Sequence, residues 1–232
     1  MTSLWVPGFD IAKYQGEMTC AKAKRAGLKF GYIRGAKGLN RDEFTLRNAS
    51  RAKRNAMLFG IYLFFHPAID IGQQTDLLIQ LHKSTGATLV PMIDVEAHDA
   101  LAAFRITRGL HRMVTRLTIA VGKPPTIYTG AGFWNKYVHD VTYSHCPLWT
   151  ARYAHKTVAQ YRADPVPIDP SKWAEYAFMH PRPLPVIGWD RPDAWQFAGE
   201  NNRCGKRYGA SSLDLDVNIM REESLHKFLV AA

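Results

Sequence analysis

An apolar run near the middle of the chain ends abruptly in two acids, Thr88-Leu-Val-Pro-Met-Ile-Asp-Val-Glu-Ala97. Its first half has the continuous apolar character of a buried strand. Because side chains alternate along a strand, Asp94 and Glu96 should share one face, roughly 6.5–7 Å apart along the chain, while Val95 faces the other way. Repulsion and partial burial raise at least one carboxyl pKa and can separate a proton donor from a lasting anion. The simpler alternative is a strand that ends in two solvated acids.

Strand-like and helix-like segments alternate on both sides of this run. Strands are expected at 4–10, 30–34, 59–65 and 125–129, and helices at 19–26, 42–57, 71–84 and 99–121. This alternation predicts parallel strands joined by right-handed crossovers. Charged or aromatic residues close the strands at their C-terminal ends, namely Asp10, Arg34, Phe64 after Tyr62, Glu96 and Tyr128. Barrels built this way carry their chemistry at that end of the strands.

The regular alternation of strands and helices ends in the second half of the chain. A helix is expected at 132–138, strands at 147–153, 194–197 and 213–219, and a closing helix at 222–230. Between them, residues 155–193 give no clear element and include seven of the thirteen prolines from Pro165 to Pro192. Long segments of this kind are usually functional or disordered, and the aromatic content favours an ordered flap. We expect residues 1–232 to form a single α/β domain without a linker to a separate binding module.

Composition narrows the possible partners. The chain has 232 residues, 47% of them hydrophobic, and a formal net charge of +10. Such a charge favours polyanions, whether nucleic acid, anionic lipid or an anionic cell wall. The bases lie in helix-like segments without the interleaved aromatic residues of a single-strand nucleic-acid platform. No apolar run approaches the length of a membrane span, and the N-terminus does not resemble a signal peptide.

Cysteine and histidine spacing gives little sign of a metal or a disulfide. The widely spaced Cys20, Cys146 and Cys204 argue against a disulfide framework or a zinc knuckle and suit a reducing compartment. A metal site could be imagined at Asp94, Glu96 and His98, which alternation would put on one face. Without a second cluster of metal ligands, we expect neither a metal nor a cofactor.

Seven short motifs follow one another over nearly the whole chain. They are Gly8-Phe-Asp-Ile-Ala-Lys-Tyr-Gln-Gly16, Gly60-Ile-Tyr-Leu-Phe64, Pro91-Met-Ile-Asp-Val-Glu96, Ile127-Tyr-Thr129, Leu148-Trp-Thr-Ala-Arg-Tyr153, Trp195-Gln-Phe197 and Asp216-Val-Asn218. In this order they resemble the glycoside hydrolase family 25 lysozymes, the muramidases of bacteriophages and of some bacteria and fungi. The chain departs from the family pattern at Ala12, where Ser is common, at Leu63, where His is usual, and at Lys37, where many members have Glu. Its 155–193 segment is also longer than expected.

The resemblance implies the family's irregular, TIM-like (β/α)5(β)3 barrel. It also implies hydrolysis of the β-1,4 bond between N-acetylmuramic acid and N-acetylglucosamine in peptidoglycan. The family's catalytic residues fall on Asp94 and Glu96, with Asp10 and Asp216 as supporting acids. Glu96 would be the general acid. Asp94 would be either the nucleophile or the group that stabilises attack by the substrate's own N-acetyl group, with retention of configuration.

Further residues are expected to bind the substrate. Tyr62 would hydrogen-bond the acetamido group, and Arg34 would either bind a substrate carboxylate or pair with Asp10. Asp216 fits the late acid better than Asp214, because Asp-x-Asn completes the family pattern. The aromatic residues expected to form sugar-stacking walls are Tyr128, Trp149, Tyr153 and Trp195.

The expected partner is peptidoglycan, held partly by long-range charge attraction that salt weakens. We expect a monomer that does not bind nucleic acid or associate stably with membranes. Without a signal peptide, the protein would be made in the cytoplasm and reach the cell wall after release, which could need a holin-type partner. The alternatives are a catalytically inactive carbohydrate-binding barrel, a metal-dependent barrel hydrolase and a basic nucleic-acid-binding protein.

Overall fold

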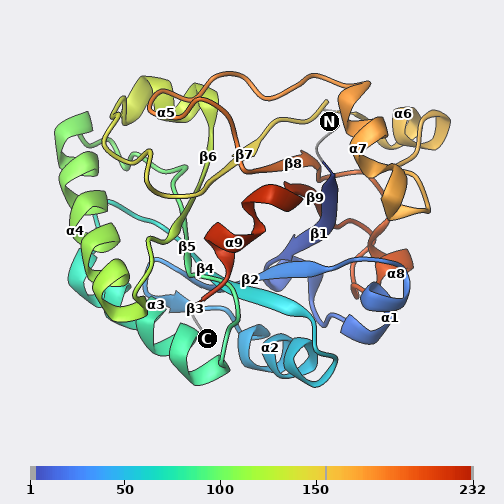
Figure 1. Ribbon diagram of the computed structural model, residues 1–232, viewed down its shortest axis with the longest axis horizontal. Coiled ribbons are helices and arrows are strands. Elements are labelled where there is room, and N and C mark those ends of the chain that lie inside the picture. The colour runs from blue at the N-terminus through green and yellow to red at the C-terminus, as the bar shows by residue number, and fades with distance from the viewer. Residues whose placement is uncertain (1–3, 155, 231–232) are drawn as a thin grey trace.

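Eight strands close a barrel in the computed structural model, which describes residues 4–154 and 156–230 (Figure 1). Around the barrel they are β1 (Trp5–Ile11), β2 (Phe30–Lys37), β4 (Leu58–Phe64), β5 (Met92–Asp94), β6 (Thr126–Gly130), β7 (Leu148–Ala151), β8 (Ala194–Ala198) and β9 (Asp216–Arg221). The barrel strands β1, β2 and β4 to β8 pair in parallel, whereas β9 is antiparallel to both β8 and β1. A short β3 (Asn40–Arg41) folds back on the end of β2. This arrangement confirms the expected single-domain α/β barrel.

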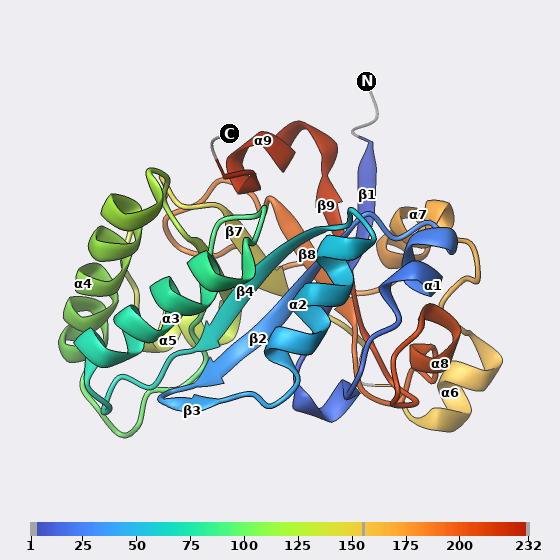
Figure 2. The ribbon, with the colours of Figure 1, turned by 90° about the horizontal axis from the view of Figure 1, so that it is seen from below.

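Helices cover the outside of the first half of the barrel (Figure 2). They are α1 (Cys20–Arg25), α2 (Thr45–Arg54), α3 (Ile71–Thr85), α4 (Ala103–Val121) and α5 (Ala131–Tyr137). Local sequence sets their ends: the Asp70 side chain accepts a hydrogen bond from the Gln73 amide at the start of α3, and α3 ends at Gly86 with φ of 67°. Among the described helices, none is long and apolar enough to cross a membrane.

Aromatic side chains fill the barrel interior at one end. Phe30, Tyr32, Trp149 and Phe228 are fully buried there and belong to one apolar cluster. Gly60 makes room for this packing, because a Cβ atom at that position would lie 2.2 Å from the Tyr32 ring. The 3₁₀ turn Glu222–Ser224 and α9 (Leu225–Phe228) carry Phe228 across this end of the barrel (Figure 1). Apolar side chains thus fill the barrel interior at the amino-terminal ends of the parallel strands.

The Pro-rich segment between β7 and β8 is more regular than the sequence suggested. It contains α6 (Val158–Ala163), the 3₁₀ turn Pro170–Lys172 and α7 (Trp173–Phe178). Trp173 is fully buried with its ring centroid 5.6 Å from that of Phe197 in β8, and Tyr176 is also buried. The prediction that residues 155–193 contain no clear element is therefore wrong, because the prolines flank short helices that pack on the outer wall of the barrel.

Two short elements complete the open end of the barrel. A 3₁₀ turn, Lys13–Gln15, follows β1, and α8 (Gly205–Tyr208) follows β8. The loop from α8 into β9 reaches the same end, where the Ser211 and Ser212 amides both donate to the Gln15 carbonyl oxygen. These loops, rather than the strands alone, shape the cavity described next.

Candidate active site

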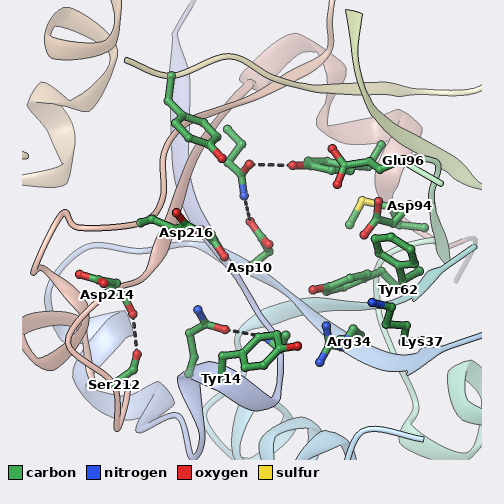
Figure 3. Close-up of a pocket in the computed structure, with 18 of the residues that line it drawn as sticks. Asp10, Tyr14, Arg34, Lys37, Tyr62, Asp94, Glu96, Ser212, Asp214 and Asp216 are labelled. Atoms are coloured by element: carbon green, nitrogen blue, oxygen red, sulfur yellow. Dashed lines mark hydrogen bonds between the residues drawn. The ribbon is translucent and has the colours of Figure 1, made fainter. Parts of the chain in front are cut away.

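A cavity of about 580 Å³ opens at the carboxyl ends of the parallel strands (Figure 3). All four predicted catalytic acids line it, and so do four of the six predicted substrate-binding residues. The lining residues that the sequence predicted are Asp10, Arg34, Tyr62, Asp94, Glu96, Tyr128, Tyr153 and Asp216. Side chains that are far apart in sequence thus meet at one place.

Asp94 and Glu96 lie at the end of β5, and the residue between them faces the other way as expected. Val95 is fully buried in the layer between barrel and helices, whereas both acids line the cavity. The Asp94 side chain is 6% exposed, and its Oδ1 atom has no hydrogen-bond partner among the described residues. Burial, followed by the charges of Glu96 and Asp10, raises the pKa of Asp94 well above its usual value.

Glu96 reaches into the cavity from just beyond the strand. Its side chain is open to the cavity solvent, yet protein surrounds it closely enough that burial is the largest influence on its pKa. Burial and the charge of Asp10 raise the pKa of Glu96 to about 7. A carboxyl group with this pKa holds a proton through mildly acidic pH and can donate it near neutrality.

Asp10 and Asp216 face each other across the β1–β9 pairing. Asp10 Oδ1 accepts hydrogen bonds from Gln196 Nε2 at 3.1 Å and from Asn218 Nδ2 at 2.8 Å. Burial raises the pKa of Asp10 to about 6 despite these two donors. Burial and the charge of Asp10 also raise the pKa of Asp216 well above its usual value. With Asp94 and Glu96 close by, the carboxyl groups cannot all be ionised together near neutral pH.

Two side chains fix the orientation of the amides that hold Asp10. The Tyr128 hydroxyl donates to Gln196 Oε1 at 2.7 Å, which leaves the amide nitrogen of Gln196 facing Asp10. Trp149 Nε1 donates to Asn218 Oδ1 at 3.2 Å, which orients Asn218 in the same way. Asp10 is therefore held in place by hydrogen-bonded chains that start in the barrel wall.

The structure does not bring Trp149 and Trp195 to the cavity, so their prediction as sugar-stacking walls is wrong. They are 0% and 1% exposed, and neither ring has an accessible face. Trp149 does point into the barrel, but it lies one layer deeper, edge-on to Phe30 and Tyr32. Trp195 points outward to Phe178, because alternation along β8 turns its neighbour Gln196 inward.

The opposite side of the cavity is basic. Arg34 pairs with Asp42 at 3.1 Å in a largely buried salt bridge, so the alternative pairing with Asp10 does not occur. The Arg34 guanidinium lies against the exposed Tyr14 ring, with Arg34 Cζ 5.2 Å from the ring centroid. Lys37 Nζ lies 4.9 Å from the centroid of Phe64. Figure 3 shows Arg34, Lys37 and Tyr14 below the acids, so the cavity has an acidic and a basic wall.

Several lining residues were not predicted, and their signals in the sequence differ. Tyr14 and Gln196 stand inside the motifs quoted above, and alternation next to Trp195 marks Gln196 as inward-facing. Glu200 has no sequence signal, because a loop after β8 brings it to the cavity. The complete unpredicted set is Ala12, Tyr14, Gln15, Lys37, Phe64, Met92, Gln196, Glu200, Ser212, Leu213 and Asp214.

A metal site at Asp94, Glu96 and His98 does not form. His98 leaves the cavity and stacks on Tyr137 with ring centroids 4.4 Å apart. Within the part of the chain that the structure describes, no group of three His, Cys, Asp or Glu side chains could hold a metal ion. The ionisable side chains that line the cavity are carboxyl groups, tyrosine phenols and the two cations Arg34 and Lys37.

Comparison with known proteins identifies the family. Residues 9–205 match the family described as Glycosyl hydrolases family 25. The uncharacterized protein YegX of Escherichia coli is 26% identical over 157 residues, which cover 65% of this chain and 57% of that protein. An N,O-diacetylmuramidase of Arthroderma benhamiae is 24% identical over 208 residues, which cover 84% of this chain and 80% of that protein.

Among solved structures, a bacterial lysozyme from Streptomyces coelicolor has the same fold. The TM-score is 0.73 at 20% sequence identity, and the match covers 97% of this chain and 96% of the other. The family match extends over most of the sequence, from the strand that carries Asp10 through the acidic end of β5 to α8. The chain therefore belongs to glycosyl hydrolases family 25.

Proposed function

We propose that this chain is a muramidase that hydrolyses the β-1,4 bond between N-acetylmuramic acid and N-acetylglucosamine in peptidoglycan. The observation that carries the proposal is the carboxyl pair at the end of β5, in which Glu96 has a pKa of about 7 and Asp94 is buried beside it. Family membership supports glycosidic chemistry. The similar Arthroderma benhamiae protein, an N,O-diacetylmuramidase, supports a muramic-acid-containing substrate.

Glu96 acts as the general acid. Cleavage of a glycosidic bond requires protonation of a poor leaving group while an oxocarbenium-like transition state forms at the sugar. The raised pKa of Glu96 keeps the proton available near pH 7. Because the side chain is open to the cavity, it can reach a bound glycosidic oxygen without rearrangement of the strand.

Asp94 supports the attacking group. Its buried Oδ1 atom, which lacks a partner among the described residues, is satisfied when the substrate's acetamido N–H donates to it. That contact orients the acetamido oxygen for attack on the anomeric carbon, and the product keeps the configuration of the substrate. Burial and the charges of Glu96 and Asp10 raise the pKa of Asp94, and the nearby cations Arg34 and Lys37 partly oppose this rise. Direct attack by the Asp94 carboxylate is the alternative, and both routes proceed with retention.

The other acids and the aromatic residues position the sugar. Asp10 raises the proton affinity of both Asp94 and Glu96, so it keeps the catalytic proton on the cavity side. Tyr62 lines the cavity below Asp94 and donates to the acetamido group. Tyr128 and Tyr153 also line the cavity and offer ring surfaces to pyranose faces.

The test is digestion of purified peptidoglycan by wild type, Glu96→Gln and Glu200→Gln. New ends are reduced with borohydride and identified by mass spectrometry. Reduced muramic acid ends are expected from wild type and from Glu200→Gln, a control that removes another carboxyl group lining the same cavity. They should be lost in Glu96→Gln.

Two outcomes would contradict the proposal. Reduced glucosamine ends would keep a hydrolase but assign it to the other glycosidic bond. Binding of peptidoglycan by all three proteins without any cleavage would favour the catalytically inactive carbohydrate-binding barrel.

A further inference from the structure

A second, smaller cavity lies outside the active site, between the loop that follows β4 and helix α4. Its volume is about 250 Å³. Three arginines of α4, Arg105, Arg108 and Arg112, form one side of it, and no carboxylate is among its described lining residues. The remaining lining residues are Pro67, Ala68, Ile71, Leu101 and Gly109.

The three arginines lie along one face of α4. Spacings of three and four residues stack side chains along a helix, and all three are exposed. Within the described part of the chain, none of them forms a salt bridge. Arg116, one turn further along the same helix, shows the contrast, because it pairs with Asp76 of α3 and donates to the Gly72 carbonyl oxygen at 3.2 Å.

Helix stability does not explain this cluster. Like charges three or four residues apart repel each other. Arg105 also lies near the start of α4, whose first turn contains no acidic residue. Cations at a helix N-terminus oppose the helix dipole. An anion held between the three guanidinium groups removes both unfavourable contributions.

The floor of the cavity is apolar because α4 approaches α3 closely at Gly109. A Cβ atom at this position would lie 3.2 Å from Ile71 Cδ1 and 3.5 Å from Phe65 Cζ. The missing side chain leaves a hollow beneath the guanidinium groups. Guanidinium groups bind phosphate oxygens through paired N–H donors. A hollow rimmed by three such groups therefore fits a phosphate better than a lone carboxylate.

This cavity borders the same end of the barrel as the active site. The loop at residues 97–102 runs from Glu96 directly into α4. It is fastened to the loop after β4 by Asp99, which accepts from the Ala68 amide and pairs with His66 Nδ1, both at 3.2 Å. A chain bound by the arginines is thus held beside the rim of the catalytic cavity.

We propose that Arg105, Arg108 and Arg112 bind the phosphodiester groups of an anionic cell-wall polymer. The proposal rests on the proposed function, because it assumes that the wall is the substrate. A wall polymer is favoured over nucleic acid because the neighbouring cavity contributes several carboxylates, which repel a polyanion that covers both sites. A phosphodiester polymer attached to the wall needs to reach only the arginines.

The test measures binding to purified, phosphate-rich cell walls in a Glu96→Gln background, so that the wall is not consumed. One variant carries Arg105→Gln, Arg108→Gln and Arg112→Gln. A matched control carries Arg25→Gln, Lys53→Gln and Arg54→Gln, which remove the same charge from exposed positions on α1 and α2. Each exposed charge pair contributes a factor of about two to five, so the loss of three pairs should weaken binding by about tenfold or more.

Walls treated with hydrofluoric acid, which removes phosphodiester polymers, separate specific binding from general attraction. On these walls the two triple variants should bind alike, and a soluble glycerol-phosphate polymer should compete on native walls. An equal loss of binding by both variants on native walls would overturn the site. A tenfold difference that persists on stripped walls would overturn its assignment to phosphodiesters.

Two further probes distinguish other sources of phosphate. Inorganic phosphate at the same total phosphate concentration should compete weakly, and equal competition would reduce the site to one for single ions. An oligonucleotide that competes as strongly as the glycerol-phosphate polymer would overturn the preference for a wall polymer. The arginine variant with Glu96 intact should cleave soluble, phosphate-free glycan fragments as fast as wild type. If wild type cleaves no glycan, the proposed function fails. The comparison of the two triple variants on native and stripped walls then still decides whether the arginines bind phosphodiesters.

Discussion

The two ends of the barrel differ in what fills them. At the end covered by α9, Trp149, Phe30, Tyr32 and Phe228 pack edge to face and are almost fully excluded from water. At the other end, carboxyl groups from β1, β5 and β9 line the cavity, and their pKa values are raised chiefly by burial. One end lowers the free energy of the folded protein, whereas the other raises it at neutral pH.

This difference explains how the site can persist. A buried carboxyl group with a raised pKa is less favourable in the folded protein than in water. Aromatic packing below it offsets that cost, and the Trp149–Asn218–Asp10 chain of hydrogen bonds connects the two layers directly. The charged end should therefore tolerate neutral substitutions that abolish activity, and the apolar end should not tolerate truncation.

Asp94→Asn should cause the largest change. The amide keeps the shape of the carboxyl group but cannot become an anion, so kcat/KM on peptidoglycan should fall by about a thousandfold or more. Because Asp94 is buried and burial raises its pKa, the folded protein resists an ionisation that the unfolded chain gains near pH 7, so the asparagine variant should also have a higher melting temperature at that pH. Turbidity assays on cell walls and thermal unfolding followed by circular dichroism measure the two effects.

Activity and stability must move in opposite directions in this variant. A variant that lost activity and also melted at lower temperature would show that Asp94 is needed for folding. That outcome would contradict the contrast between the two ends. Asn48→Ala would be an unsuitable control, because the Asn48 side chain holds the Met18 amide and the Gly16 carbonyl oxygen; the exposed Glu43→Gln is a better one.

Phe228→Ala breaks the apolar end instead. Phe228 is fully buried, and its ring centroid lies 6.4 Å from that of Trp149. Truncation of a buried phenylalanine leaves a cavity and should lower the free energy of unfolding by about 3–5 kcal/mol. Urea unfolding measures the loss, and the exposed neighbour His226→Ala should change stability by about 0.5 kcal/mol or less. The kcat of the folded fraction should stay near that of wild type, and a large fall in kcat would mean that the two ends are not separable.

Much of the fold could be predicted because the first strands and helices carry local sequence signals for where they begin and end. Asp70 and Gly86 bound α3 as a cap and a left-handed stop, and the apolar strands alternate with amphipathic helices. The direction of β9 could not be predicted in this way. The short α8 lies between β8 and β9, and this connection does not fix the direction of the next strand, so tertiary packing decides that β9 runs antiparallel. In the 155–193 segment the prolines suggested irregular chain, although Pro170 begins a 3₁₀ turn that leads into α7.

The site could be predicted where its residues end strands and not where loops deliver them. Asp10, Asp94 and Glu96 follow from strand periodicity and from the family resemblance. Glu200 could not be predicted, because its position depends on the loop after β8. The tryptophans were predicted to bind sugar because they stand inside the motifs. Their burial in the barrel, and the alternation that turns Gln196 inward beside Trp195, show instead that Trp149 and Trp195 are structural.

Asp10→Asn tests the charged end through the pH dependence of stability. The pKa of Asp10 is raised from 3.8 to about 6 in the folded protein. Below pH 4 the group is protonated in both folded and unfolded chains, so it adds no cost. As pH rises from about 4 to 6 the unfolded chain ionises first, and above pH 6 the full cost is present. A shift of this size corresponds to about 2–3 kcal/mol, which the asparagine variant should regain at pH 8 and not at pH 3.5.

The asparagine side chain of this variant keeps the hydrogen bonds from Gln196 and Asn218, because its amide oxygen can replace the Oδ1 atom of Asp10 as their acceptor. Denaturant unfolding at a series of pH values measures the difference in stability, and a difference that does not change with pH would mean that burial does not raise the pKa of Asp10. The charge of Asp10 also raises the pKa of Glu96. Any remaining activity should therefore lose its basic limb at lower pH than wild type, because a Glu96 carboxyl freed from that repulsion gives up its proton more readily.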